Sequence, residues 1–421
     1  MPFRRFFAVA ALCLSPRAAS LPGAPLLPLS PIEARSGDAV EVRGMIDELE
    51  RRFPPARTNE AALRLEEKAA LVGIALAPEK TSNRHRPAAA EKSVYDAARA
   101  AVSGFVTREA TGENEEAGLL PEEVARFLSL RGEALAAVRD ELLSSAQPPR
   151  WEMDLTKGAQ YAPLPNLLGI LNLQKLLLAA ALSESLQGRA EEAERHLEAS
   201  WRLNEALVAR PELISQLIAI AGGKLQIGIL RKLAFDREPW LERLPRQDFR
   251  AAFFWSLRAE ATASLGGEGK QGSPELLEYA RGMREVVREL EKENACSFRQ
   301  EGAERFWQPL FPGREARVLS GITLPNLTDA VHRVFRFELD RELTALVLEA
   351  RRALRSRQEG RRPDFQDRPS LVCPGARWNY RISGGGDALT IAFEGHLPEW
   401  ETVALKLPLS FRFAAVAPRR P

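Results

Sequence analysis

The sequence predicts a mainly α-helical protein of stacked antiparallel helical hairpins, followed by a small three-stranded antiparallel β-sheet near its C-terminal end. Two observations lead to this fold class. Through most of the 421 residues, apolar side chains recur every three to four positions, as they do on one face of a helix. After about residue 370 they alternate instead, which is the period of a half-buried strand. With 45% hydrophobic residues, the chain is long and apolar enough to bury a large core.

The first twenty residues have the layout of a secretory signal. Two arginines within the first five residues precede an apolar run that ends at Leu14, and small residues follow as far as Ser20. The apolar run is too short to span a bilayer stably, so we expect a cleaved signal at 1–20; a retained anchor or a frayed terminus are the alternatives. The proline-rich residues 21–36 then form a linker. The expected location is therefore periplasmic or secreted.

The charge balance argues against nucleic acid as a partner. The chain has 59 basic and 57 acidic residues, a formal charge of +2, and removal of the first twenty residues would take away three arginines and leave −1. Such a balance provides no overall positive field to attract a polyanion. We expect instead another envelope protein or a peptide as the partner, with contact to a membrane surface as a weaker alternative. The sequence does not predict an oligomeric state.

Four amphipathic helices are expected in the N-terminal helical region, residues 37–146. Each has apolar residues at helical spacing, and Pro, Gly or charged loops separate them. The segment that follows, 147–163, is rich in proline and polar residues and contains Trp151 and Tyr161. We expect it to be ordered but irregular, and able to line a groove. The expected helices span 38–53, 59–77, 88–109 and 121–146.

The central hairpins, within residues 147–265, include three successive helices that the rest of the chain is expected to surround. Gly188 can adopt the left-handed conformation that ends the first helix, and Pro211 suits the first turn of the third. The third helix has apolar side chains around its whole circumference, which predicts burial on most sides. A stripe of small residues around Gly222 would let another helix approach closely there.

Within these hairpins, residues 177–205 resemble one tetratricopeptide helical hairpin. Small or apolar residues occupy matching positions in the two helices and the turn: Ala181, Gly188, Ala193, Leu197 and Ser200. The aromatic and proline positions of the family are not matched, and no second copy follows after about 34 residues. The resemblance implies a TPR-like, α-solenoid-like stack whose concave face recognises a partner. The chain as a whole is similar to uncharacterised exported proteins of GC-rich bacteria, which have no assigned activity.

Three more helices are expected. One precedes a flexible glycine-rich loop, and the other two follow that loop, in a C-terminal helical region at 266–358. Two of the helices span 247–265 and 274–295, and the third opens at Leu324 and reaches about residue 358. It begins Leu-Pro-Asn-Leu, as does the helix that opens at Leu164. The repeat indicates either a remote internal duplication or simply a good helix start, because asparagine is a favoured cap.

The sheet is expected within residues 370–415. Apolar residues alternate over 378–382 and 389–393, and the three glycines between these segments predict a turn. Apolar residues then occupy every odd position over 403–413, which predicts a third strand. Pro408 lies within it and requires an edge position or a bulge.

The chain has no residues at the spacing of known catalytic, cofactor or metal sites. No G-x-S-x-G, S-x-x-K or H-E-x-x-H motif occurs. The loop at 266–271 lacks the first glycine and the Ser or Thr of a phosphate-binding loop, and the four histidines are scattered without metal-ligand spacing. Cys373 and His396 could act as nucleophile and base, with a structural cysteine as the alternative. No catalytic, cofactor or metal residue is therefore predicted.

Polar and aromatic residues in and beside the central hairpins are the candidates for a ligand or partner cleft. A buried amide or hydroxyl without a partner costs about 1 to 3 kcal/mol, so such groups must pair with each other or with a ligand. The sequence allows both alternatives. The candidate residues are Trp151, Tyr161, Gln174, Ser185, Ser215 and Gln226.

Basic residues near the end of the long helix are the candidates for anion binding. Arg351, Arg352 and Arg355 lie close together in the sequence, and guanidinium groups bind phosphates well. Cations are also expected at the C-terminal end of any helix, where they oppose its dipole.

Cys296 and Cys373 are expected to form a disulfide if the protein is exported. Cys13 would be lost with the signal, and an oxidising envelope permits the other two to pair. Both are predicted at the ends of elements, where the backbone can adjust to disulfide geometry. Two buried free thiols are the alternative.

The architecture favours a binding or scaffold protein, because stacked hairpins offer a concave face without any catalytic group. The main alternative is a small-ligand carrier or hydrolase whose site lies between residues 147–163 and the central helices. Such a hydrolase would need two acids, for example Glu152 and another, to converge in a closed pocket. A component of an envelope secretion or pilus assembly is a further alternative, suggested by the helix-then-sheet order.

Overall fold

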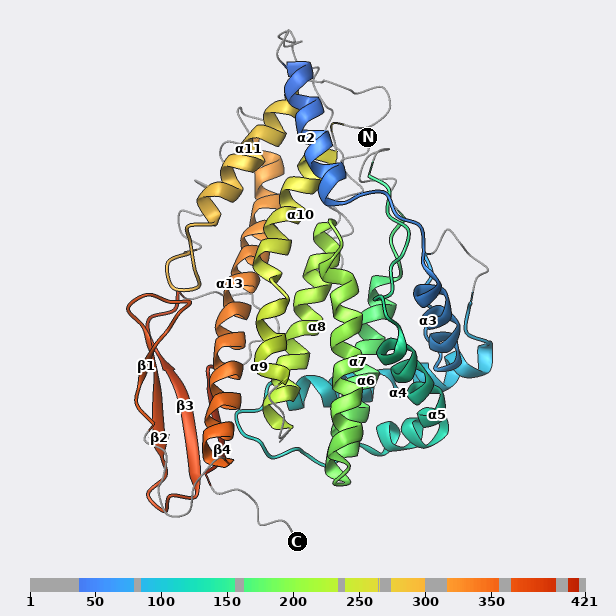
Figure 1. Ribbon diagram of the computed structural model, residues 1–421, viewed down its shortest axis with the longest axis vertical. Coiled ribbons are helices and arrows are strands. Elements are labelled where there is room, and N and C mark those ends of the chain that lie inside the picture. The colour runs from blue at the N-terminus through green and yellow to red at the C-terminus, as the bar shows by residue number, and fades with distance from the viewer. Residues whose placement is uncertain are drawn as a thin grey trace.

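The computed structural model describes residues 38–78, 85–155, 163–233, 239–263, 265, 274–299, 316–355, 365–398 and 408–415. The expected signal and linker lie outside these residues. The described residues form a mainly helical protein with one small antiparallel sheet near the C-terminal end (Figure 1). The expected fold class is therefore confirmed.

Four helices form the N-terminal region: α2 (Asp38–Arg52), α3 (Glu60–Leu71), α4 (Ala89–Ala110) and α5 (Glu122–Ser144). Asn59 starts α3, because its side chain accepts a hydrogen bond of 2.9 Å from the amide of Ala62. The same helix ends earlier than expected, at Leu71 instead of residue 77. Gly73 has a φ of 85°, a left-handed conformation in which a helix does not continue.

Three consecutive helices form the centre of the protein: α6 (Leu167–Leu186), α7 (Ala190–Val208) and α8 (Leu213–Lys232). Asn166 starts α6 by accepting a hydrogen bond of 2.9 Å from the amide of Gly169. Gly188 has a φ of 76° and provides the left-handed residue between α6 and α7. The three helices pack against one another, and α8 also contacts α4, α10 (Phe249–Ala263) and α13 (Ala316–Arg355) (Figure 1).

Helix α8 is buried around most of its circumference, as its composition predicted. Two of its glycines mark close contacts. A Cβ atom would lie 2.3 Å from Oε1 of Gln174 at Gly222, and 2.4 Å from the backbone oxygen of Ala110 at Gly228. Both α6 and α8 are long and apolar enough to cross a membrane, but 72% and 89% of their apolar windows are buried inside the protein. Burial of this extent is the arrangement of core helices.

The last long helix begins earlier than expected. The preceding elements are α9 (Pro239–Arg243), the 3-10 helix η3 (Leu244–Arg246), α10 and α11 (Pro274–Leu290). The expected start at Leu324 was wrong, because α13 begins at Ala316 and continues through Pro325. A proline removes one backbone hydrogen bond, and a helix that extends for many turns on its C-terminal side can tolerate that loss.

The sheet has the strand order β1-β2-β3-β4, and all neighbouring strands are antiparallel. The strands are β1 (Arg368–Pro369), β2 (Arg377–Ile382), β3 (Ala388–Glu394) and β4 (Ser410–Ala414). β1 is an addition to the three expected strands, because two residues are too few to show an alternation. Of the third expected strand, residues 403–407 lie outside the described part of the chain. Arg412 forms backbone hydrogen bonds with Glu113 and Glu115, which cover the outer edge of β4.

The sheet and the helices share one core. β3 and β4 pack on α13 (Figure 1). Buried apolar residues from Val42 in α2 to Ala415 after β4 belong to one continuous cluster. From the sheet, Trp378 and Ile391 contribute side chains that are 0% exposed. The sheet is therefore fixed relative to α13, which positions the loop between β1 and β2.

Candidate functional site

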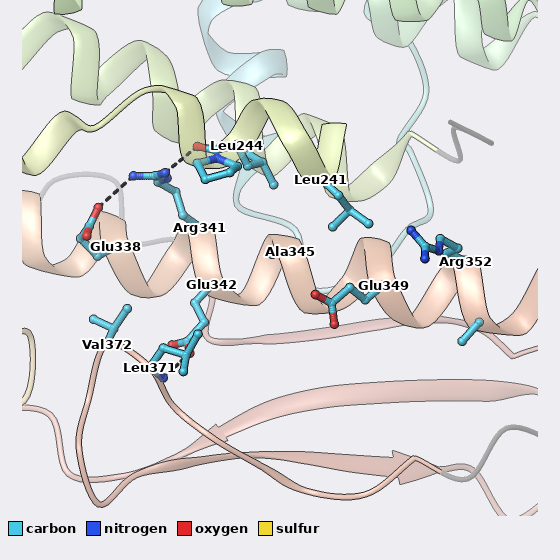
Figure 2. A pocket seen from close by; sticks show the side chains of 12 residues that line it. Leu241, Leu244, Glu338, Arg341, Glu342, Ala345, Glu349, Arg352, Leu371 and Val372 are labelled. Atoms are coloured by element: carbon cyan, nitrogen blue, oxygen red, sulfur yellow. Dashed lines mark hydrogen bonds and ion pairs between the residues drawn. The ribbon is translucent and has the colours of Figure 1, made fainter. Parts of the chain in front are cut away.

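A groove of about 730 Å³ lies along one side of α13 (Figure 2). One wall comes from α9 and η3, and the other comes from the loop that joins β1 to β2. Sites for small molecules and short peptide segments typically enclose about 300 to 1,000 Å³. The groove, which we call the α13 groove, is therefore large enough to be a binding site.

The floor of the α13 groove is one stripe of the helix. Glu338, Glu342, Ala345 and Glu349 line it, and their spacing of four, three and four residues places them on the same helix face. A different face of the helix is buried in the core, where Leu343 is 0% exposed. The floor is consequently held rigidly by core packing.

The first wall is apolar and anchored. Leu241, Leu244 and Pro245 line the groove from α9 and η3. Trp240 of α9 is 0% exposed and fastens this short helix to the core. The backbone oxygen of Leu244 accepts a hydrogen bond from Arg341 of α13, which joins the wall to the floor (Figure 2).

The second wall, Leu371 and Val372, is held at both of its ends. The carboxylate of Glu342 accepts hydrogen bonds from the amide of Leu371 and, at 2.6 Å, from the hydroxyl of Ser370. The next residue after the wall is Cys373, which forms a disulfide with Cys296, with 5.6 Å between their Cα atoms. The structure thus contains the disulfide that the sequence allowed. It attaches the β1–β2 loop to the segment that follows α11.

Leu371 is apolar, fixed in position and 90% exposed. Single exposed leucines are common on protein surfaces. This one differs because it faces a groove whose opposite wall is also formed by leucine. Figure 2 shows Leu371 and Leu241 on opposite sides of the α13 stripe. The two walls therefore offer apolar contacts to anything that enters the groove.

The carboxylates of the floor already have partners within the protein. Glu338 accepts a hydrogen bond of 3.0 Å from Arg341 (Figure 2). Glu349 accepts one of 2.6 Å from Arg368. Burial raises the pKa of Glu338, and the charge of Arg341 opposes this effect. Acid–base catalysis needs carboxylates that can exchange protons with a substrate.

Two of the expected cleft residues, Trp151 and Gln174, are in the core instead of lining the groove. Trp151 is 1% exposed, and its indole N–H donates to Oε1 of Glu66 at 3.0 Å. Gln174 is 0% exposed and donates to Oδ1 of Asn204 at 3.0 Å. The donors of Trp151 and Gln174 thus pair with protein groups outside the candidate set, while Oε1 of Gln174 is buried without a hydrogen-bond partner.

Ser185, Ser215 and Gln226 are also absent from the lining of the α13 groove. Gln226 donates to the backbone oxygen of Ser200 at 2.7 Å, and Ser215 donates to Glu212 at 3.1 Å. Ser185 is partly buried near the end of α6. Tyr161 lies outside the described residues. The structure therefore does not bring the five described candidates together in one cleft.

The three candidate anion-binding arginines have different environments. Arg351 is 6% exposed, donates to Glu115 at 3.1 Å and lies 5.2 Å from the ring centroid of Phe413. It connects α13 to the α4–α5 loop and to the sheet. Arg352 is exposed and lines the α13 groove, while Arg355 is partly buried at the end of the helix.

The proposed nucleophile and base do not form a catalytic pair. Cys373 is bonded to Cys296, so its sulfur is not available as a thiolate, and that hypothesis was wrong. His396 is exposed. Glu152 is also exposed and therefore does not face a second acid across a closed pocket. Within the described ranges, no group of three or more His, Cys, Asp or Glu residues could hold a metal ion.

No family model, no curated protein and no solved structure matches this chain. The resemblance of residues 177–205 to a tetratricopeptide hairpin consequently stays a prediction. Any function must be inferred from the geometry of the molecule itself.

Sequence reasoning missed the walls and most of the floor of the α13 groove. The glutamates of its floor have helical spacing, but the same pattern is typical of an ordinary solvated helix face. The two walls come from Leu241 and Leu371, which are 130 positions apart, so no local periodicity relates them. A useful signal was the pair Leu371 and Val372 next to Cys373, because a disulfide holds neighbouring residues in place.

Proposed function

We propose that this protein is an exported binding or scaffold protein whose α13 groove binds a short apolar peptide segment of a partner protein. The observation that supports this most strongly is Leu371, which is 90% exposed and yet held by Glu342 and by the disulfide of Cys373. These contacts hold the backbone of Leu371 in place, so a partner that covers this residue does not have to order the loop first. The groove is thus prepared for apolar contact.

The chemistry of the lining favours a neutral or basic apolar peptide. Leucine, valine, proline and alanine side chains form the walls and part of the floor. The charged lining residues are three glutamates and two arginines, a formal charge of −1, which disfavours an acidic segment. A volume of about 730 Å³ accommodates a few side chains of such a peptide.

A peptide partner fits the groove better than the alternative roles. A hydrolase would need free acids, whereas Glu338, Glu342 and Glu349 are bonded within the protein. A small-ligand carrier would need a pocket that buries most of its ligand. At the α13 groove, however, Leu371 and Arg352 are exposed to solvent.

Export is supported by two independent features. Residues 1–20 have the layout of a secretory signal. The disulfide of Cys296 and Cys373 is a bond that persists in oxidising compartments and is rare in the cytosol. Both features favour a partner in the cell envelope or outside the cell.

Peptide display against the full chain with its disulfide intact tests the proposal. Selected peptides are expected to be rich in apolar residues. Leu371→Ala removes three carbon atoms, which at about 0.8 kcal/mol per buried CH₂ should weaken their binding about 50-fold. Leu130→Ala is the matched control, because Leu130 is a 61% exposed leucine on α5, away from the groove. The proposal fails if no apolar peptide is selected, or if Leu371→Ala binds the selected peptides as tightly as the unmodified protein does.

A further inference from the structure

Three cations are buried in α8, which packs against α13. One of them, Lys232, forms an ion pair with Glu109, whereas Lys224 and Arg231 form none with a described residue. Lys224 is 3% exposed and Arg231 is 1% exposed, although most other residues of this helix are apolar or small. They are seven residues apart, so their side chains leave the same side of the helix with about 10 Å between the Cα atoms. Burial lowers the pKa of both cations. Asp340 of α13 is 0% exposed, and its negative charge raises the pKa of both and so opposes the effect of burial.

Asp340 does not neutralise these two cations by direct contact. Among the described residues its ion-pair partner is Arg336, whose Nε lies 3.5 Å from Oδ1. Neither Lys224 nor Arg231 reaches a described carboxylate within the 4.0 Å of an ion pair. In the same described part of the chain, Nε and Nη2 of Arg231 are buried without an acceptor, and Nη1 donates to Pro408 at 3.3 Å.

Two positive charges are therefore buried without a direct ion pair among the described residues, and the one buried carboxylate that acts on both, Asp340, pairs with a third cation, Arg336. Buried charges in proteins are normally paired or bound to an ion, because the interior solvates them poorly. The ring of Phe411 lies 5.8 Å from the guanidinium of Arg231 and compensates for only part of this loss. Burial lowers the pKa of Lys224 to about 8, so its ammonium group stays mostly charged at pH 7. The site has both the charge and the free donors that an anion requires.

We propose that Lys224 and Arg231 bind a phosphate group in the interior between α8 and α13. Its oxygens accept hydrogen bonds from Nε and Nη2 of Arg231, in the forked geometry that guanidinium offers to phosphate, and from the ammonium group of Lys224. A divalent phosphate balances the two cations, while Asp340 stays paired with Arg336. The site is separate from the α13 groove and independent of its function.

Thermal unfolding of the full chain in increasing inorganic phosphate, at constant ionic strength, measures this binding. Phosphate should raise the unfolding temperature in a saturable way, because it binds the folded chain alone. Lys224→Met should weaken the apparent affinity for phosphate at least about tenfold. The matched control is Lys175→Met, which removes a half-buried lysine of α6 that donates to Ser103 at 2.8 Å. This control should leave the phosphate effect unchanged.

A variant with the opposite effect separates binding from a merely structural role. Asp340→Asn keeps the shape of the side chain but removes a negative charge, so phosphate should bind about threefold or more tightly. Equilibrium dialysis of the unmodified chain should find one phosphate bound per chain. The same measurement with glycerol phosphate shows whether the site also binds a phosphate monoester. The proposal is rejected if phosphate gives no saturable effect, if Lys224→Met responds like the unmodified chain, or if Asp340→Asn binds phosphate more weakly.

Discussion

Gly222 of α8 lies directly against Gln174 of α6, where a Cβ atom would be 2.3 Å from the amide oxygen Oε1. The other atom of that amide, Nε2, donates to Asn204 of α7 at 3.0 Å, and Asn204 donates to the backbone oxygen of Ala219 at 3.0 Å. All three central helices meet at this point. The absence of a side chain at Gly222 is what allows the amides to lie between them.

Gly222→Leu should therefore destabilise the protein. The added side chain overpacks a contact that has no free space, which costs about 1 to 3 kcal/mol or more. Gly132→Leu is the control, because Gly132 lies in α5 with no atom within 4 Å of its ideal Cβ position. The control should gain up to about 1 kcal/mol from better helix propensity. Urea unfolding measures both changes, and a stabilised Gly222→Leu variant would show that α8 is not packed as described.

The disulfide of Cys296 and Cys373 should leave no free thiol in exported protein from which Cys13 has been removed. The two cysteines are 77 positions apart, and closing a loop of that length stabilises by about 4 kcal/mol in the chain-entropy model. Replacing both by alanine should lower the free energy of unfolding by a similar or smaller amount. Thiol titration of denatured, non-reduced protein checks the bond directly, and two thiols per chain would contradict it.

The stability should fall as the pH rises through the titration range of Glu260. Burial raises the pKa of this carboxyl to about 7, although the amide of Leu213 donates to it at 2.9 Å. An unfolded glutamate has a pKa of about 4.3, so between about pH 4.5 and 7 the folded chain binds a proton that the unfolded chain has released. This proton difference lowers the free energy of unfolding steadily over that range, and above about pH 8, where both states are deprotonated, Glu260 causes no further change.

Glu260→Gln should remove this pH dependence. A glutamine is neutral at every pH and can still accept the hydrogen bond from Leu213. The variant should be more stable than the unmodified protein by up to about 3 kcal/mol at pH 8, with a much smaller difference at pH 5. Urea unfolding at the two pH values makes the comparison. An equal difference at both would mean that Glu260 does not titrate in this range.

Export should remove the first twenty residues. The small residues as far as Ser20 and the Leu-Pro that follows them fit cleavage near Ser20. Intact-mass measurement of protein recovered from the envelope or the medium should give a chain that begins close to Leu21. Recovery of exported protein that still contains Met1 would reject cleavage.

Most of the helices could be predicted from the sequence because local signals define them. Gly188 marks the boundary between α6 and α7 by its backbone preference, and the largely apolar α8 has no plausible place except the core. Pro211 was expected in the first turn of α8 but lies just before it, because Glu212 is the N-cap. The start of α13 could not be predicted in this way. Pro325 is a strong local signal for a helix boundary. In the structure, however, the helix is continuous on both sides of this residue.

The candidate sites depend on contacts that the sequence does not encode locally. Leu241 and Leu371 form opposite walls of one groove only because η3 and the β1–β2 loop pack on the same helix. The sequence alone allowed Gln174 and Gln226 either a ligand or internal pairing, and the structure shows that the amide nitrogen of each donates to another protein group. Lys224 was detectable, because a lysine in the middle of an apolar helix must be buried with it.

Photo-crosslinking across the α13 groove tests the central claim most directly. A photoreactive phenylalanine analogue replaces Leu241 in one variant, Leu371 in a second and, as a control, Leu130 in a third. If the groove holds an apolar peptide, the first two variants should form crosslinks to the same bound peptide from opposite walls, and the third should form none. Crosslinks that appear equally at position 130, or at neither wall, would contradict the assignment of this groove as the binding site.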